Sequence, residues 1–227
     1  MFRMANHAYA SVWTRGSSEA PTLGRFGVLL STVPFTGEQP VLTSFVVRAV
    51  ELTQPPLFDQ DSRLQPIAAV EALALAGEYL DDDVAYEATA HWDLWAYDVN
   101  DAAWQLLPQP LLLTCYGEQY DGGVCREMGN FHVDLGFEHL FTGHAGLLGF
   151  RRNAVARPED PIEAAFVRAM SDEKNLREYR DKTYENIRKL LDWMQRINTA
   201  LPVEKSVLWS EGEKNFEARL EEIVVTR

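Results

Sequence analysis

Residues 86–98 read YEATAHWDLWAYD, and residues 130–138 read NFHVDLGFE. In both stretches apolar and polar side chains alternate, which indicates strands with one buried and one polar face. Between them lies the apolar run 111–116, LLLTCY, after the break Pro108-Gln109-Pro110. We expect these three segments to pair as an antiparallel meander.

The segments on either side supply further elements. Apolar and β-branched residues predict strands at 8–14, 26–33 and 41–52, with the last two forming a hairpin. Helical periodicity predicts helices at 66–75, 161–170 and 213–224, and one long amphipathic helix at 172–199. Strands followed by helices predict an α+β fold, with an antiparallel sheet from the N-terminal two-thirds packed against C-terminal helices.

Charge divides the 227-residue chain into two regions. Residues 1–150 hold six Arg, no Lys and 19 acidic residues, and therefore all of the net charge of −13. Residues 151–227 hold 15 basic and 15 acidic residues. We expect an acidic β-rich region and a helical region that pack together as one domain. The charge argues against a duplex nucleic-acid partner; it fits either a basic partner or a surface that only keeps the chain soluble.

The sequence predicts a cytoplasmic protein with no membrane partner. No apolar run of signal-peptide or membrane-spanning length occurs in it. Only two cysteines are present, Cys115 and Cys125. In a reducing compartment we expect them to be small buried thiols rather than a disulfide.

A repeated His-x-Asp pattern is the candidate metal site. His91 and Asp93 lie two residues apart in the first alternating stretch, as do His132 and Asp134 in the second. Residues at i and i+2 of a strand point the same way, and His with Asp suits Zn²⁺, Mn²⁺ or Fe²⁺. However, the intervening strand separates the two pairs by roughly 10 Å, so only a curved sheet brings them together. The alternative is an ordinary polar strand face.

Three residues are candidates for ligand binding. Trp95 and Tyr97 share the strand face of His91, where aromatic rings beside carboxylates line a ligand pocket or a protein-binding patch, unless a helix covers that face. His144 lies in the glycine-rich stretch Gly143–Gly149, which is compatible with an anion-binding loop or with glycines used for turns.

Two functional hypotheses follow. No nucleophile elbow, zinc-protease motif or phosphate-binding loop occurs in the chain. The first hypothesis is therefore a non-enzymatic protein that binds a small molecule or another protein. The second is a metal-dependent hydrolase built on the paired His-x-Asp motifs. The length of helix 172–199 also favours a homodimer that pairs through it.

Overall fold

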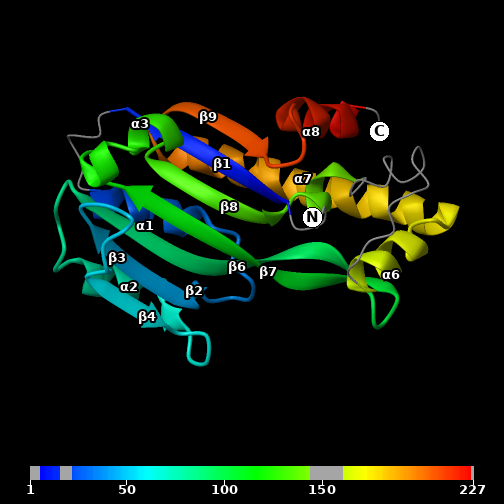
Figure 1. The fold of residues 1–227 in the computed structure, drawn as a ribbon, viewed down its shortest axis with the longest axis horizontal. Coiled ribbons are helices and arrows are strands. Elements are labelled where there is room, and N and C mark those ends of the chain that lie inside the picture. The colour runs from blue at the N-terminus through cyan, green and yellow to red at the C-terminus, as the bar shows by residue number, and fades with distance from the viewer. Residues whose placement is uncertain (1–5, 16–21, 144–160, 226–227) are drawn as a thin grey trace.

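The computed structural model describes residues 6–15, 22–143 and 161–225. Seven of the strands form one sheet in the order β4-β3-β6-β7-β8-β1-β9, with every neighbouring pair antiparallel. This arrangement, with the helices drawn in Figure 1, confirms the α+β fold. The elements in chain order are β1 (His7–Thr14), α1 (Thr22–Thr32), β2 (Val41–Leu42), β3 (Ser44–Ala49), β4 (Phe58–Asp61), β5 (Ile67–Ala68), α2 (Ala69–Ala76), β6 (Val84–Asp98), β7 (Ala103–Tyr116), η1 (Tyr120–Gly122), α3 (Cys125–Met128), β8 (Phe131–Phe137), α4 (His139–Thr142), α6 (Pro161–Ala169), α7 (Glu173–Ala200), β9 (Val203–Ser210) and α8 (Phe216–Val225).

The predicted meander forms the centre of the sheet. β6 pairs with β7 from Ala85↔Tyr116 to Asp98↔Ala103, and β7 pairs with β8 from Leu112↔Asp134 to Cys115↔Phe131. The register follows from the alternation, because a shift of one residue would turn every apolar side chain of a strand to the opposite face.

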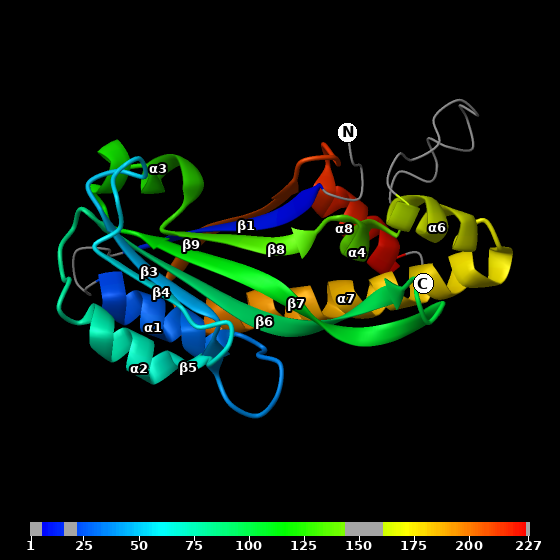
Figure 2. The same cartoon turned by 60° about the horizontal axis from the view of Figure 1, so that its bottom comes forward.

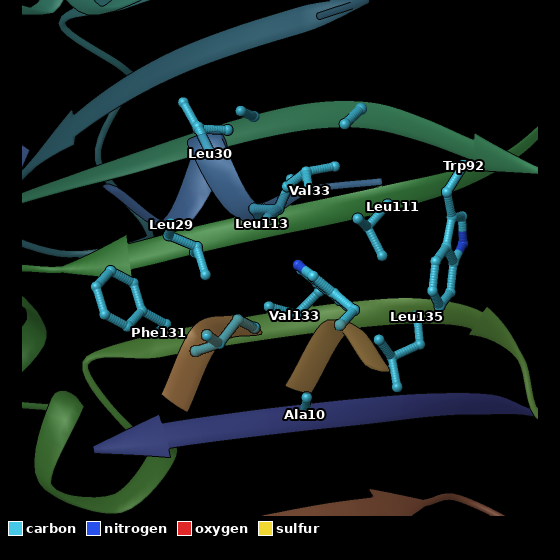
Figure 3. Close-up of a cluster of buried hydrophobic side chains, with 14 of the residues drawn as sticks. Ala10, Leu29, Leu30, Val33, Trp92, Leu111, Leu113, Phe131, Val133 and Leu135 are labelled. Carbon is cyan, nitrogen blue, oxygen red and sulfur yellow. The ribbon is translucent and has the colours of Figure 1, made fainter. Parts of the chain in front are cut away.

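One face of the sheet builds the core. Leu29, Leu30 and Val33 lie on one side of the sheet. Figure 3 shows the strand side chains that point to this side: Ala10, Trp92, Leu111, Leu113, Phe131, Val133 and Leu135. Trp92 and Trp193 meet edge to face with ring centroids 5.7 Å apart, and the Trp193 indole donates to Thr32 Oγ1 at 3.0 Å. Helices α1, α2 and α7 lie on this side of the sheet (Figure 2).

The long helix α7 uses its apolar stripe within the chain. Its first turn is capped by Asp172, whose carboxylate accepts from the backbone N–H of Lys174 and Asn175. The buried stripe runs from Tyr179 to Ile197, and its middle and C-terminal part belongs to the same apolar cluster as the sheet. This packing accounts for the amphipathic pattern of α7 without a second subunit, so the length of the helix no longer argues for a dimer.

The hairpin predicted for 26–52 is wrong in its first half. Residues 22–32 form helix α1, and Phe26, Leu29 and Leu30 turn one buried face toward the core. Val, Thr and aromatic residues favour strands only weakly and in a context-dependent way. Here a spacing of three to four residues lets the segment bury its apolar side chains as a helix.

The sheet also contains a strand from the C-terminal region. β9 pairs with β1 from Ala8↔Ser210 to Thr14↔Val203 and forms one edge of the sheet. The expectation that the sheet comes from the first 150 residues is therefore incomplete. β9 was missed because Glu204 and Lys205 break the apolar pattern, as charged residues often do on edge strands.

Candidate functional site

The sheet face opposite the core carries the candidate site. None of the described helices crosses the middle of this face, whereas α1, α2 and α7 cover the other one (Figure 2). We call the outward side chains of β6, β7, β8, β1 and β9 the open face. The alternation of β1 and β8 fixes which residues lie on it, because their apolar partners Ala8, Ala10, Val12, Phe131, Val133 and Leu135 are buried in the core.

Three rings pack together across adjacent strands of the open face. Tyr9 of β1 stands opposite Trp209 of β9, and their ring centroids lie 4.3 Å apart with planes inclined by 22°. Tyr9 also stacks on His132 of β8 at 5.4 Å and 18°, and the centroids of His132 and Trp209 lie 6.0 Å apart, so the three rings form a triangle. We call Trp209, Tyr9 and His132 the ring stack.

Ser11 links Trp209 to His132. The Trp209 indole N–H donates to Ser11 Oγ at 3.3 Å, and Ser11 Oγ lies 3.4 Å from His132 Nδ1. A hydroxyl oxygen has two acceptor lone pairs and one hydrogen, so the contact with Nδ1 is compatible with either tautomer of His132. Ser11 is 3% exposed, which keeps it from acting as a nucleophile toward a bound substrate.

A second polar group lies beside the ring stack. His7 Nδ1 contacts both carboxylate oxygens of Asp134, at 2.8 and 2.7 Å, and the Gly136 N–H donates to the same carboxylate at 2.8 Å. The Tyr9 hydroxyl donates to Glu211 at 3.0 Å. Burial and this contact with Glu211 raise the pKa of Tyr9, so its hydroxyl remains a donor at neutral pH.

The structure does not bring the two His-x-Asp pairs together. His91 stands opposite Pro110 and His132 opposite Thr114, four residues apart along β7, which is about 13 Å along the strand. The Asp93 carboxylate accepts from the Thr36 hydroxyl at 2.9 Å, while Asp134 is held by His7. Among residues 6–15, 22–143 and 161–225, no group of three or more His, Cys, Asp or Glu side chains is placed to hold a metal ion.

Helices cover two of the remaining ligand candidates, Trp95 and Tyr97. Trp95 is against α7: its backbone N–H donates to Asn186 Oδ1 at 2.8 Å, and Lys182 Nζ lies 3.4 Å from its ring centroid. Tyr97 packs at 5.8 Å against Phe166 of α6. These contacts give both rings a packing role. His144 lies outside the described residues.

Sequence reasoning missed the residues that matter most on the open face. Tyr9 and Ser11 alternate with buried alanines in β1, so the signal for their side of the strand was present. Trp209 was missed with its strand. Their proximity to His132 depends on β1 pairing with both β8 and β9, and these pairings join segments more than 100 residues apart.

Comparison with protein-family models, with curated proteins and with solved structures finds no match in any of the three. None of the described helices is both long and apolar enough to cross a bilayer. The function is therefore argued from the geometry of the described residues alone.

Acidification is expected to destabilise the folded chain through His132. Burial lowers the pKa of His132, and the Asp134 carboxylate raises it only in part, so the folded-state pKa lies below the ordinary value near 6.5. The unfolded chain then binds more protons than the folded chain. The contribution of neutral His132 to the free energy of unfolding is therefore fully present above pH 6.5 and is lost as the pH falls through the folded-state pKa.

Urea unfolding measured between pH 8 and pH 5 should show this decrease in the free energy of unfolding. The decrease should be smaller in His132→Phe, which keeps a ring in the stack. An NMR titration that gives His132 a pKa of 6.5 or higher would contradict the argument.

Proposed function

We propose that the chain is a binding protein that holds a basic, extended segment of a partner protein against the open face. The observation that carries this proposal is a sheet face without a described helix over its middle, on which Asp134 and Glu211 lie beside an ordered ring stack and further carboxylates lie across the sheet toward β4. This is the non-enzymatic hypothesis; no group of ligands among the described residues supports the metal-dependent hydrolase.

Charge complementarity argues for a basic partner. The register places Asp59 and Asp61 of β4 and Glu87 of β6 on the same side as Asp134. Arg48 contacts Glu87 at 2.9 Å and Arg63 pairs with Asp61, so these two charges are partly offset, whereas Asp59 has no ion pair among the described residues. The chain as a whole carries a net charge of −13, so electrostatic attraction would also speed the encounter with a cationic segment.

The side chains of the open face argue for a polypeptide partner. Trp209, Tyr9 and His132 pack in a triangle with ring centroids 4.3, 5.4 and 6.0 Å apart. Beside them Leu112 of β7 is 40% exposed and offers apolar contact. Aromatic rings, an exposed apolar side chain and carboxylates on one face suit a lysine- or arginine-containing segment.

Both cysteines are free thiols, which fits a reducing cytoplasm as the proposed compartment.

Two synthetic twelve-residue peptides test this proposal. They share their apolar residues, but one carries lysine and arginine where the other carries glutamate. We expect the basic peptide to shift backbone amide NMR signals of β1, β8 and β9 in ¹⁵N-labelled protein, and to bind more weakly as salt increases. The acidic peptide should leave these signals unchanged.

Matched charge variants locate the binding. The double variant Asp59→Asn/Asp134→Asn should bind the basic peptide at least fivefold more weakly. The control Asp192→Asn/Glu221→Gln also removes two exposed charges, one from α7 and one from α8, and should bind like the unmodified chain. If the control and the double variant weaken binding alike, or if the shifts spread equally over α7, binding follows net charge and the proposal fails.

A further inference from the structure

A cavity of about 400 Å³ lies on the helical side of the molecule, away from the open face. It is formed where the end of α4 meets α7 and α8, and its described lining consists of Thr142, Gly143, Arg180, Asp181, Thr183, Tyr184, Arg219 and Ile223. This volume is in the range of pockets that hold small metabolites.

Within the described part of the chain, two buried polar atoms in this lining have no hydrogen-bond partner. They are the Thr183 hydroxyl, on a residue that is 1% exposed, and Nε of Arg219. Buried polar groups are nearly always paired, because an unpaired one loses its contact with water without compensation. Two such atoms lining one cavity indicate a missing acceptor within it.

The guanidinium of Arg219 is already fixed by its other nitrogens. Nη2 donates to the Thr142 carbonyl at 3.3 Å, and Nη1 pairs with Glu222 at 2.6 Å. The N–H of Nε is therefore held in place with no acceptor among the described residues. The position of Thr183 is equally specific, since it interrupts the apolar stripe of α7 between Tyr179 and Ile187, where an apolar residue would bury no polar atom.

Charge and chemistry identify the kind of ligand. Arg180 adds a second cation to the lining. Asp181, the acid of the lining, has interactions of its own within the chain, and Glu222 pairs with Arg219 through Nη1 and leaves Nε available. Arginine N–H groups match the oxygens of carboxylates and phosphates. We propose that this cavity binds a small molecule through an oxyanion, which accepts hydrogen bonds from Arg219 Nε and the Thr183 hydroxyl, while Ile223 contacts the apolar part of the ligand.

The side-chain Nε–Hε signals of arginine in ¹⁵N-labelled protein test this proposal directly. The probes are sodium phosphate, sodium acetate and sodium chloride at equal ionic strength, and the Arg219 signal is assigned from its loss in Arg219→Lys. We expect a saturable shift of this signal with phosphate or acetate and none with chloride. The stronger of the two responses decides between a phosphate and a carboxylate ligand. No saturable shift with either oxyanion would overturn the proposal.

Matched variants separate a built site from general attraction of anions. Thr183→Val removes the hydroxyl at nearly constant volume, so it should bind the oxyanion at least fivefold more weakly while melting no lower than the unmodified chain. Thr199→Val and Arg188→Lys make the same changes at exposed positions of α7 and should leave binding unchanged. If Thr183→Val and Thr199→Val bind alike, the hydroxyl takes no part and the assignment is wrong.

Discussion

Asn186→Ala should lower the free energy of unfolding by about 3–5 kcal/mol. Asn186 is 2% exposed on α7, and its amide makes three hydrogen bonds to backbone groups. It accepts from the Trp95 N–H at 2.8 Å and donates to the carbonyls of Trp95 at 2.9 Å and of Leu140 at 3.0 Å. Alanine leaves these three backbone groups without a partner, at about 1–3 kcal/mol for each buried one.

Urea and thermal unfolding measure this effect. For a chain of this size, a loss of 3–5 kcal/mol corresponds to a decrease of roughly 6–20 °C in melting temperature. Asn198→Ala, at an exposed position of the same helix, is the control and should stay within about 0.5 kcal/mol. A loss below 1 kcal/mol in Asn186→Ala would show that water replaces the amide at this junction.

The role of Asn186 explains why the interpretation of Trp95 and Tyr97 from sequence was incomplete. Alternation correctly placed Trp92 on the buried face of β6. Alternation cannot show that the far half of the β6–β7 hairpin extends toward α6 and the start of α7. There Trp104 stacks on Tyr179 at 5.3 Å, in a second apolar cluster that contains Phe166 and is bordered by Tyr97. A polar-looking face is thus covered by helices that lie far away in the sequence.

The elements that could be predicted are those whose pattern is long and local. β6, β8 and α7 each show their period over seven or more residues, and all three are confirmed. α1 was misassigned, because the eight residues 26–33, FGVLLSTV, fit a strand as well as a helix until their packing partners are known.

The candidate site depended on strand order, which the sequence does not contain. Both His-x-Asp pairs were recognised, and the strand between them was correctly expected to separate them. The partners that His132 has in the structure, Tyr9 and Ser11, come from the first strand of the chain. A motif within one strand identifies side chains on a face, but only the pairing of strands identifies their neighbours.

Gly129→Ala should be among the most damaging single substitutions in the chain, with an expected loss of about 4 kcal/mol or more. Gly129 follows α3 with φ of 96° and ψ of 159°, a conformation adopted almost only by glycine. An added Cβ would also lie 2.8 Å from the Val12 nitrogen and 2.9 Å from the carbonyl oxygens of Val12 and Phe131. These are backbone atoms of β1 and β8, which cannot move apart without breaking the ladder between them.

Gly122→Ala is the comparison for a positive φ in free space. Gly122 has a φ of 67°, and an added Cβ would meet nothing within 4 Å. Its loss should therefore be about 1 kcal/mol, the cost of the left-handed conformation alone. Thermal unfolding should show a decrease of roughly 8–16 °C for Gly129→Ala against about 2–4 °C for the control. Equal losses would mean that neither the close approach of β1 and β8 nor the particular conformation of Gly129 adds to the cost of a positive φ. Since β1 carries Tyr9 and Ser11, the Gly129 variant should also displace the NMR signals of His132, and the control should leave them in place.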